Sequence, residues 1–297
     1  MTTKLSGFTF IKDGLSLGYP IKESIESISP ICDEIIINVG FNDIECTKDD
    51  GTWSFLTNHF KAPKYKFIKS WWDPEMTSKG LILSQQTNLA LKECQGQYCQ
   101  YIQGDEAIHE KDFQIIKEAI EKMDHTPESQ GLIFQYRHFY GNTDILKHTR
   151  NTYRREVRLI KNGIGTQSFL DAQGFKTHDG KKLKCIETNA RIFHYGWARN
   201  SILMDKKNKA FNKLYHGTHH KTDDFSYRRI WGLKKFQETH PTVMKKWIES
   251  HKEELDILSL PLSFEWKNLG LAISDGLESL TGYRMGEYKN FEVIGSL

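Results

Sequence analysis

The chain has 297 residues, of which 38% are hydrophobic and 27% are charged, a balance typical of a soluble globular protein rather than a disordered one. Lysine and arginine outnumber aspartate and glutamate by 41 to 38, and a net charge of +3 is too close to zero to indicate bulk nucleic-acid binding. The sequence has no run of 18 apolar residues, so we expect no membrane-spanning helix.

Two further features indicate a cytoplasmic location. The first residues, Met-Thr-Thr-Lys-Leu-Ser-Gly, lack the apolar stretch of a signal peptide. The five cysteines are odd in number and scattered along the chain, which fits reduced thiols better than a disulfide framework. We therefore expect a cytoplasmic protein.

The first half of the chain alternates strands and helices. Short apolar runs predict the strands, and apolar residues at helical spacing predict the helices between them. Strands are expected at residues 7–11, 35–39, 65–70 and 98–103, and helices at residues 19–28, 52–60, 81–92 and 111–123. This order predicts an α/β fold with a mostly parallel sheet, whose right-handed crossovers place helices on both faces.

The pattern changes after a fifth expected strand at residues 131–139. Strands at residues 153–160 and 191–195 flank a glycine-rich polar segment, and from Ser201 the chain becomes helical and basic. Pro241 opens another helix. We therefore expect one α/β domain over residues 1–200, followed by a helical, basic extension over residues 201–297.

The stretch from Tyr98 to Glu110 holds the first candidate site. Its strand ends at Gly104, which allows a sharp turn, and the carboxylate pair Asp105 and Glu106 follows. Open α/β sheets bind ligands at the carboxyl ends of their strands. Carboxylate oxygens there suit Mg²⁺ or Mn²⁺, and such a cation suits a diphosphate. The alternative is a solvated loop that happens to be acidic.

The usual nucleotide-binding motifs are missing from the sequence. The dinucleotide fingerprint needs G-x-G-x-x-G after the first strand, which Gly14 and Gly18 do not provide. A P-loop needs four residues between its glycines, whereas Gly174 and Gly180 enclose five, and Lys181 is not followed by serine or threonine. A nucleotide on this sheet would therefore be held by a metal ion and side chains.

The order of several short motifs resembles a family 2 glycosyltransferase of the GT-A fold. The motifs are Ser6-Gly-Phe-Thr-Phe-Ile-Lys-Asp, Tyr19-Pro-Ile-Lys-Glu-Ser-Ile, Asp33-Glu-Ile-Ile-Ile, Asp50-Gly-Thr, Gln86-Thr-Asn-Leu-Ala-Leu, Gln103-Gly-Asp-Glu and His194-Tyr-Gly-Trp-Ala-Arg199. The resemblance covers roughly residues 5–200. It implies transfer of a sugar from a nucleotide-sugar, assisted by a divalent cation and with inversion at the anomeric carbon, to a glycan or lipid-linked acceptor.

The resemblance also implies roles for individual residues. Gln103-Gly-Asp-Glu matches the D-x-D position as a bacterial Q-x-D-E variant, which leaves Asp105 as the direct metal ligand and His194 as a second candidate. Many family members grip a pyrimidine base with an acidic pair, whose matching positions here are Val39 and Gly40. The donor-binding candidates are Lys12, Asn38, Asn42, Gln86, Asn88, Gln103 and Arg199.

The reaction needs a base that takes the proton of the acceptor hydroxyl. Asp171 follows the metal motif and precedes the late histidine motif, an order that suits an acceptor-side base, with Asp179 and Glu187 as rivals. Glu106 is the other catalytic candidate, through a metal-bound water, and the alternative is that it holds its loop.

Two groups of residues suggest acceptor and membrane contacts. Tyr195 and Trp197 could stack on an acceptor sugar, or could simply pack beside a strand. The basic residues between Lys206 and Lys235 form either a solvated helix face or a surface that approaches anionic lipid at the inner face of the membrane.

Other functions stay open at this point. Gln103 in place of an acid, and the missing pyrimidine-gripping pair, allow a non-catalytic GT-A domain that binds carbohydrate or nucleotide. A nucleotidyltransferase would need a glycine- and lysine-rich loop after the first strand, for which Lys12-Asp-Gly-Leu-Ser is poor. Turnover of a nucleotide-sugar separates an enzyme from a binding module.

Overall fold

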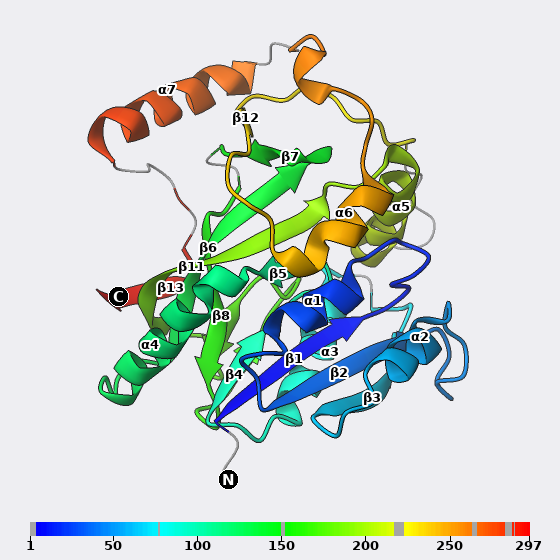
Figure 1. Cartoon of the computed structure of the whole chain (residues 1–297), viewed down its shortest axis with the longest axis vertical. Helices are drawn as coiled ribbons and strands as arrows, with labels where there is room; N and C mark the ends of the chain where they lie inside the picture. Colours follow the sequence, from blue (N-terminus) through cyan, green and yellow to red (C-terminus); the bar gives the residue numbers. More distant parts are fainter. Residues whose placement is uncertain are drawn as a thin grey trace.

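The computed structural model describes residues 4–76, 78–149, 152–216, 223–262, 266–282, 287 and 289–297. These residues form a large sheet of 11 strands with helices packed on both faces (Figure 1). A separate two-stranded sheet lies beside it.

Four parallel strands form the N-terminal half of the large sheet. They are β1 (Leu5–Ile11), β2 (Glu34–Phe41), β3 (Tyr65–Trp71) and β4 (Tyr98–Tyr101), and their order is β4-β1-β2-β3. They alternate with α1 (Ile21–Ile28), α2 (Thr52–His59) and α3 (Leu81–Lys92). All eight residues of β2 are buried, because helices cover both faces of a parallel sheet. The predicted strand–helix alternation is confirmed here.

The other half of the sheet is mixed. β8 (Arg155–Lys161) is antiparallel to both β4 and β6 (Gly131–Tyr140), and β11 (Leu183–Trp197) is parallel to β6. Across the whole sheet, parallel pairs of residues outnumber antiparallel ones, which confirms the predicted mostly parallel α/β fold. Only the end of β11 was predicted, because polar residues such as Lys184 and Glu187 interrupt its first half.

Several short elements were not predicted from the sequence. The strands are β5 (Glu106–Ile108), β7 (Asn142–Lys147), β9 (Thr166–Ser168), β10 (Phe175–Thr177), β12 (Leu233–Lys235) and β13 (Phe291–Ser296). The 3-10 turns are η1 (Glu110–Asp112), η2 (Thr242–Met244) and η3 (Ile257–Ser259). Most of these elements have only three residues, too few to show a periodic pattern.

Helices cover the two faces of the sheet unequally. α1, α2 and α4 (Phe113–Asp124) pack on one face through residues such as Ile25, Leu56 and Ile120. α3 packs on the other face through Ala90 and Leu91. Figure 1 shows α1 and α4 in front of the strands. The carboxyl ends of β1 and β4 therefore lie between two helical layers, which is where a ligand site is expected.

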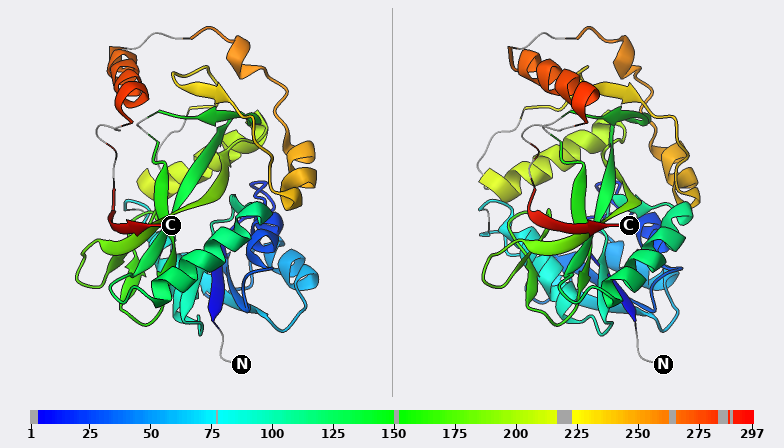
Figure 2. Two further views of the ribbon diagram at one scale, coloured as in Figure 1. Left: turned by 60° about the vertical axis from the view of Figure 1, so that its left-hand side comes forward. Right: turned by 90° about the vertical axis from the view of Figure 1, so that its left-hand side faces the viewer.

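The helices expected after Ser201 and Pro241 are present as α5 (Ser201–His216) and α6 (Lys245–His251), and a further helix, α7 (Trp266–Thr281), lies in the tail, whose pattern was ambiguous. The extension does not stay separate, because β13 pairs with the beginning of β11 and β12 pairs with β7. The division of the chain at residue 200 stays a prediction. Figure 2 shows α7 set apart from the sheet. In the part of the chain that the structure describes, no helix is long and apolar enough to cross a membrane.

Candidate functional site

A cavity of about 450 Å³ lies at the carboxyl ends of β1 and β4. Its walls include the loops after β1 and β3, the turn after β4, the loop over residues 169–174, the end of β11 and one side of α5. The charged, histidine and amide side chains that line it are Lys12, Asp13, Gln103, Asp105, Asp171, Gln173, His194, Lys207 and Asn208. A concave site with convergent polar groups at this edge of an α/β sheet is the expected ligand site.

The turn after β4 places Asp105 in this cavity. The Glu106 backbone N–H donates to the Gln103 carbonyl oxygen over 3.0 Å and closes the turn. A Cβ atom on Gly104 would lie 2.9 Å from the Ile11 side chain, so the turn needs glycine in order to pack against β1. The predicted turn is therefore present, and close packing is one reason for its glycine.

Three basic side chains surround the Asp105 carboxylate. Lys207 Nζ lies 2.8 Å and Arg199 Nη2 lies 3.9 Å from Oδ2, and His194 Nε2 lies 3.7 Å from Oδ1. Burial alone would raise the pKa of Asp105, but the charges of these neighbours outweigh burial and hold the pKa well below its ordinary value. Asp105 is therefore an ionised carboxylate inside the protein.

Lys207 is the cation that sequence reasoning missed. Its Nζ donates to Asp105 Oδ2 and to the Gly196 carbonyl oxygen, each over 2.8 Å. Burial lowers the pKa of Lys207 to about 8, against the attraction of Asp105, so the ammonium form still predominates at neutral pH. A signal was present in the sequence, because Met204, Lys207 and Phe211 are spaced to share one face of α5. A lysine on that apolar face differs from its solvated neighbours in the basic run.

Arg199 lies behind Asp105 and is fully buried. Its Nη1 donates to the Leu17 carbonyl oxygen over 2.6 Å, and its guanidinium lies 4.6 Å from the centre of the Tyr19 ring. Lys207 Nζ lies 5.1 Å from the same ring. Among the residues that the structure describes, Nε and Nη2 of Arg199 have no hydrogen-bond partner. Two cations thus share one aromatic ring and one carboxylate.

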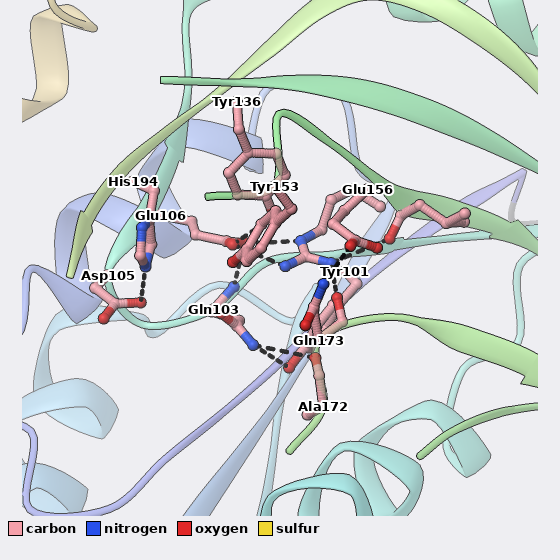
Figure 3. A network of polar contacts seen from close by, with 12 residues as sticks. Tyr101, Gln103, Asp105, Glu106, Tyr136, Tyr153, Glu156, Ala172, Gln173 and His194 are labelled. Atoms are coloured by element: carbon pink, nitrogen blue, oxygen red, sulfur yellow. Dashed lines mark hydrogen bonds and ion pairs between the residues drawn. The ribbon is translucent and has the colours of Figure 1, made fainter. Parts of the chain in front are cut away.

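His194 is oriented by a second histidine. His138 Nε2 donates to the Tyr153 carbonyl oxygen over 2.7 Å, so in a neutral ring its Nδ1 is an acceptor. His194 Nδ1 lies 2.8 Å from His138 Nδ1 and must therefore donate to it. Burial lowers the pKa of both rings. The other ring nitrogen of His194, Nε2, faces Asp105 Oδ1 (Figure 3).

The end of β11 needs a glycine for this arrangement. A Cβ atom on Gly196 would lie 2.5 Å from His194 Nε2 and 3.1 Å from Asp105 Oδ2. Any larger residue would therefore push the histidine and the carboxylate apart. This explains the glycine of the His194-Tyr-Gly-Trp segment in physical terms.

Glu106 is buried in a polar network beside the cavity rather than on its wall (Figure 3). Arg158 donates to its two oxygens over 2.9 and 3.0 Å, and Tyr136 donates over 2.6 Å. The Gln103 backbone N–H adds a bond of 3.1 Å. This geometry favours the alternative in which Glu106 holds its loop. Arg158 was not predicted, because a basic residue inside a short strand pattern carries no motif.

Asp171 lies on the cavity wall in a strained loop. Its neighbours Leu170 and Ala172 have φ angles of 51° and 60°, which non-glycine residues adopt only where the surroundings enforce them. The Tyr215 hydroxyl donates to Asp171 Oδ2 over 3.3 Å, and Gln103 Nε2 donates to the Ala172 carbonyl oxygen over 3.2 Å. The loop is thus tied both to α5 and to the turn after β4.

The two rival bases are placed elsewhere. Asp179 forms an exposed ion pair with Lys181, and Glu187 is paired with Arg155 over 2.7 Å. Neither Asp179 nor Glu187 lines the cavity. The structure therefore brings only Asp171 of these three carboxylates to the site.

The predicted donor-binding residues divide into two groups. Lys12 and Gln103 line the cavity, and Lys12 is paired with Asp13 over 2.5 Å. Arg199 lies behind Asp105, as described above. The remaining four candidates, Asn38, Asn42, Gln86 and Asn88, do not line the cavity. Asn38 donates to the backbone and side-chain oxygens of Gln86, Asn42 lies on an exposed loop, and Asn88 binds the backbone of Ser168.

The two predicted acceptor-binding aromatic residues also differ. Tyr195 is buried and stacks on Phe139 with ring centres 4.9 Å apart, which is the packing alternative. Trp197 is 43% exposed and lines the cavity. A further tryptophan, Trp72, lines the cavity from the loop after β3 and lies against Gly40, where a Cβ atom would be 2.2 Å from the indole nitrogen.

A divalent cation between Asp105 and His194 would find two protein ligands. Within the described residues, no group of three or more His, Cys, Asp or Glu side chains is placed to hold a metal ion. Oδ2 of Asp105 is already bonded to Lys207, and Arg199 adds a second positive charge. The two positive charges of Lys207 and Arg199 exceed the single negative charge of Asp105, so a dication would be repelled at this position. The residues present do not fit a resident divalent cation.

No family model and no curated protein matches the chain. Among solved structures it is similar to S. aureus TarS, with 15% sequence identity and a TM-score of 0.36 over 54% of this chain and 29% of TarS. It is similar to S. aureus TarS 1-349 in complex with UDP-GlcNAc, with 18% identity and a TM-score of 0.33 over 49% and 39% of the two chains. The mannosyltransferase PcManGT from Pyrobaculum calidifontis, in complex with GDP-Man and Mn²⁺, shows 15% identity and a TM-score of 0.33 over 46% and 36%. The chain spans less than half the length of each of these structures, and at such TM-scores the likeness carries no inference about the site.

Proposed function

We propose that this protein transfers a sugar from a nucleotide-sugar donor to a hydroxyl group of a glycan or lipid-linked acceptor. The observation that supports this best is that one cavity brings together the side chains that the reaction needs. Lys207 and Asp105 lie at the carboxyl edge of the sheet, and Asp171 lines the same cavity. A diphosphate needs buried cations, and an acceptor hydroxyl needs a base, so these are the groups that the reaction requires. The order of the short sequence motifs supports the same assignment.

In this proposal Asp171 takes the proton of the acceptor hydroxyl. The acceptor oxygen then forms a bond to the anomeric carbon while the bond from that carbon to the diphosphate oxygen breaks. The nucleoside diphosphate leaves with the electron pair, and the configuration at the anomeric carbon inverts. Tyr215, which donates to Asp171 Oδ2, keeps the other carboxylate oxygen available for the acceptor.

Trp72 is the residue best placed to contact the nucleobase. It lies against Gly40, one of the two positions at which related enzymes are expected to carry a pyrimidine-gripping acid. Lys12 Nζ lies 5.9 Å from its ring centre. Stacking on an indole tolerates any base, because every base has a π-face. We therefore expect weak discrimination between nucleoside diphosphates.

The alternative is a binding module that holds a nucleotide or a carbohydrate without turnover. The basic side chains Lys207 and Arg199, together with Trp72, would serve both functions equally well. The strained loop that presents Asp171 is of a kind found at active sites and at ligand clamps, so turnover of a nucleotide-sugar is what separates the two functions.

A thermal-shift panel tests ligand binding directly. The panel contains UDP, GDP, CDP, ADP, their common sugar conjugates and the corresponding free nucleosides, each at millimolar concentration. A ligand that binds only the folded protein raises the melting temperature by mass action, with about 2.7 kcal/mol of stabilisation at one hundred times Kd. We expect shifts with several diphosphates and none with the free nucleosides. If no nucleotide shifts the melting temperature, the proposed function is wrong.

A further inference from the structure

Resting on the proposed function, we propose that Lys207, backed by Arg199, is the cation that binds the donor diphosphate in place of a divalent metal ion. The side chains that a metal would need are instead arranged to hold an ammonium group at the cavity. Asp105 then serves to position Lys207 and is not a metal ligand.

Among the residues that the structure describes, one N–H of Lys207 is without a partner and lies at the cavity. An ammonium group has three N–H donors, and two of them go to Asp105 Oδ2 and the Gly196 carbonyl oxygen. Lys207 itself lines the cavity, so the third donor is available to a ligand there. The rings of Tyr19 and Phe211, whose centres lie 5.1 and 5.3 Å from Nζ, keep the ammonium group in position.

The charges of the cluster favour an anion. Asp105 contributes one negative charge, and Lys207 and Arg199 contribute one positive charge each. The cluster therefore has a net charge of +1 in a buried setting, where charges interact strongly. A dication would be repelled by this charge, whereas a diphosphate is attracted to it.

Arg199 acts on this site through Asp105. Its guanidinium is fully buried, and it faces the same carboxylate oxygen as Lys207 from a distance of 3.9 Å. The positive charge of Arg199 partly neutralises the Asp105 carboxylate. The positive charge of Lys207 is then less compensated by Asp105 and attracts an anionic ligand more strongly. When the bond to the anomeric carbon breaks, the diphosphate gains negative charge, and a fixed ammonium group stabilises that charge without rearrangement.

The test is calorimetric and uses the whole chain. UDP and inorganic pyrophosphate are titrated into the protein in EDTA, and the titrations are repeated with 1–5 mM Mn²⁺, on the order of free cation levels that saturate weak carboxylate sites. We expect Kd for both ligands in EDTA to stay within about twofold of Kd in Mn²⁺. We expect Lys207→Met to weaken both ligands about tenfold or more, since a charged hydrogen bond is lost.

Matched variants separate binding from folding. Lys209→Met removes a lysine two residues along α5, where it pairs with Asp205 and Asp224 away from the cavity, and it should bind like the parent. Lys207→Arg should retain most of the affinity. If Lys207→Met does not fold, the double variant Asp105→Asn with Lys207→Met removes both charges together and should show the same loss.

The outcomes distinguish this inference from the proposed function. Diphosphate binding that requires Mn²⁺, that survives unchanged in folded Lys207→Met, or that does not occur at all would overturn the inference. Turnover of a nucleotide-sugar only with Mn²⁺ would also overturn it while the proposed function stands. Binding in EDTA that depends on Lys207, without any turnover, would support the inference and contradict the proposed function.

Discussion

At the scale of single residues, Glu156 is a buried carboxyl group next to the network that holds Glu106. Gln173 Nε2 donates to its Oε1 over 2.5 Å. Burial raises the pKa of Glu156 to about 7, although the nearby charge of Arg158 opposes this. Glu156 is therefore protonated in the folded protein at pH values where it is ionised in the unfolded chain.

This shift predicts how stability depends on pH. The pKa of Glu156 is near 4.5 in the unfolded chain and higher in the folded protein. Proton binding to Glu156 therefore stabilises the folded state fully at pH values below about 4.5, and this stabilisation is lost as the pH rises to about 7. We expect Glu156→Gln to remove this loss, with a difference from the parent of up to ~3 kcal/mol at pH 8, since one pKa unit corresponds to about 1.4 kcal/mol. Urea unfolding from pH 4.5 to 8 measures it.

The control for this measurement is Glu118→Gln on the exposed side of α4. It should follow the parent at every pH. Parallel stability curves for Glu156→Gln and the parent would show that Glu156 does not titrate between pH 4.5 and 7.

At the scale of elements, α7 has an inverted arrangement of polar and apolar residues. Its exposed residues include Trp266, Leu269, Ile273, Leu277 and Leu280, at spacings that place them on one face. Its polar residues turn inward instead, since Asp275 accepts from Trp231 over 3.2 Å and Glu278 is paired with Arg154. An apolar helix face of this kind, in a chain that also exposes Lys234 and Lys235 on β12, suits an anionic lipid surface.

We expect binding to vesicles that contain anionic lipid, and loss of that binding in Ile273→Glu and Leu277→Glu. Each lysine or arginine near the surface contributes about 1 kcal/mol, which salt screens. Co-sedimentation with anionic and neutral vesicles at low and high salt measures this. Ile44→Glu, at an apolar residue that is 67% exposed in a different part of the chain, is the control. Equal binding to neutral and anionic vesicles at low salt would rule out this role.

At the scale of the whole molecule, the sequence predicted the sheet better than the site. Strands β1 to β4 are short runs rich in apolar and aromatic residues, and they alternate with helical patterns, so local patterns were enough to find them. β12 and β13 were missed because each is stabilised by pairing with a strand far away in the sequence. Their residues carry too little pattern of their own.

The site shows the same limit of local patterns. Asp105 and His194 were found because they lie in short motifs, and the structure brings them within 3.7 Å of each other. Lys207 comes from a helix more than a hundred residues after Asp105, and its charge becomes important only through that contact. Asn38 and Gln86 matched motif positions, yet they bond to each other inside the fold. Position in a motif could not show which side chains face the cavity.

The central claim is that the cavity transfers a sugar with Asp171 as the base. The most direct measurement is the release of nucleoside diphosphate from a panel of UDP-, GDP-, CDP- and dTDP-sugars with a mixture of glycan acceptors. The parent and the Asp179→Asn control should turn over at least one donor, and Asp171→Asn should lower that rate by about 10²–10⁴-fold while binding the donor normally. If the parent releases no nucleoside diphosphate from any donor, or if folded Asp171→Asn keeps the full rate, the claim is contradicted.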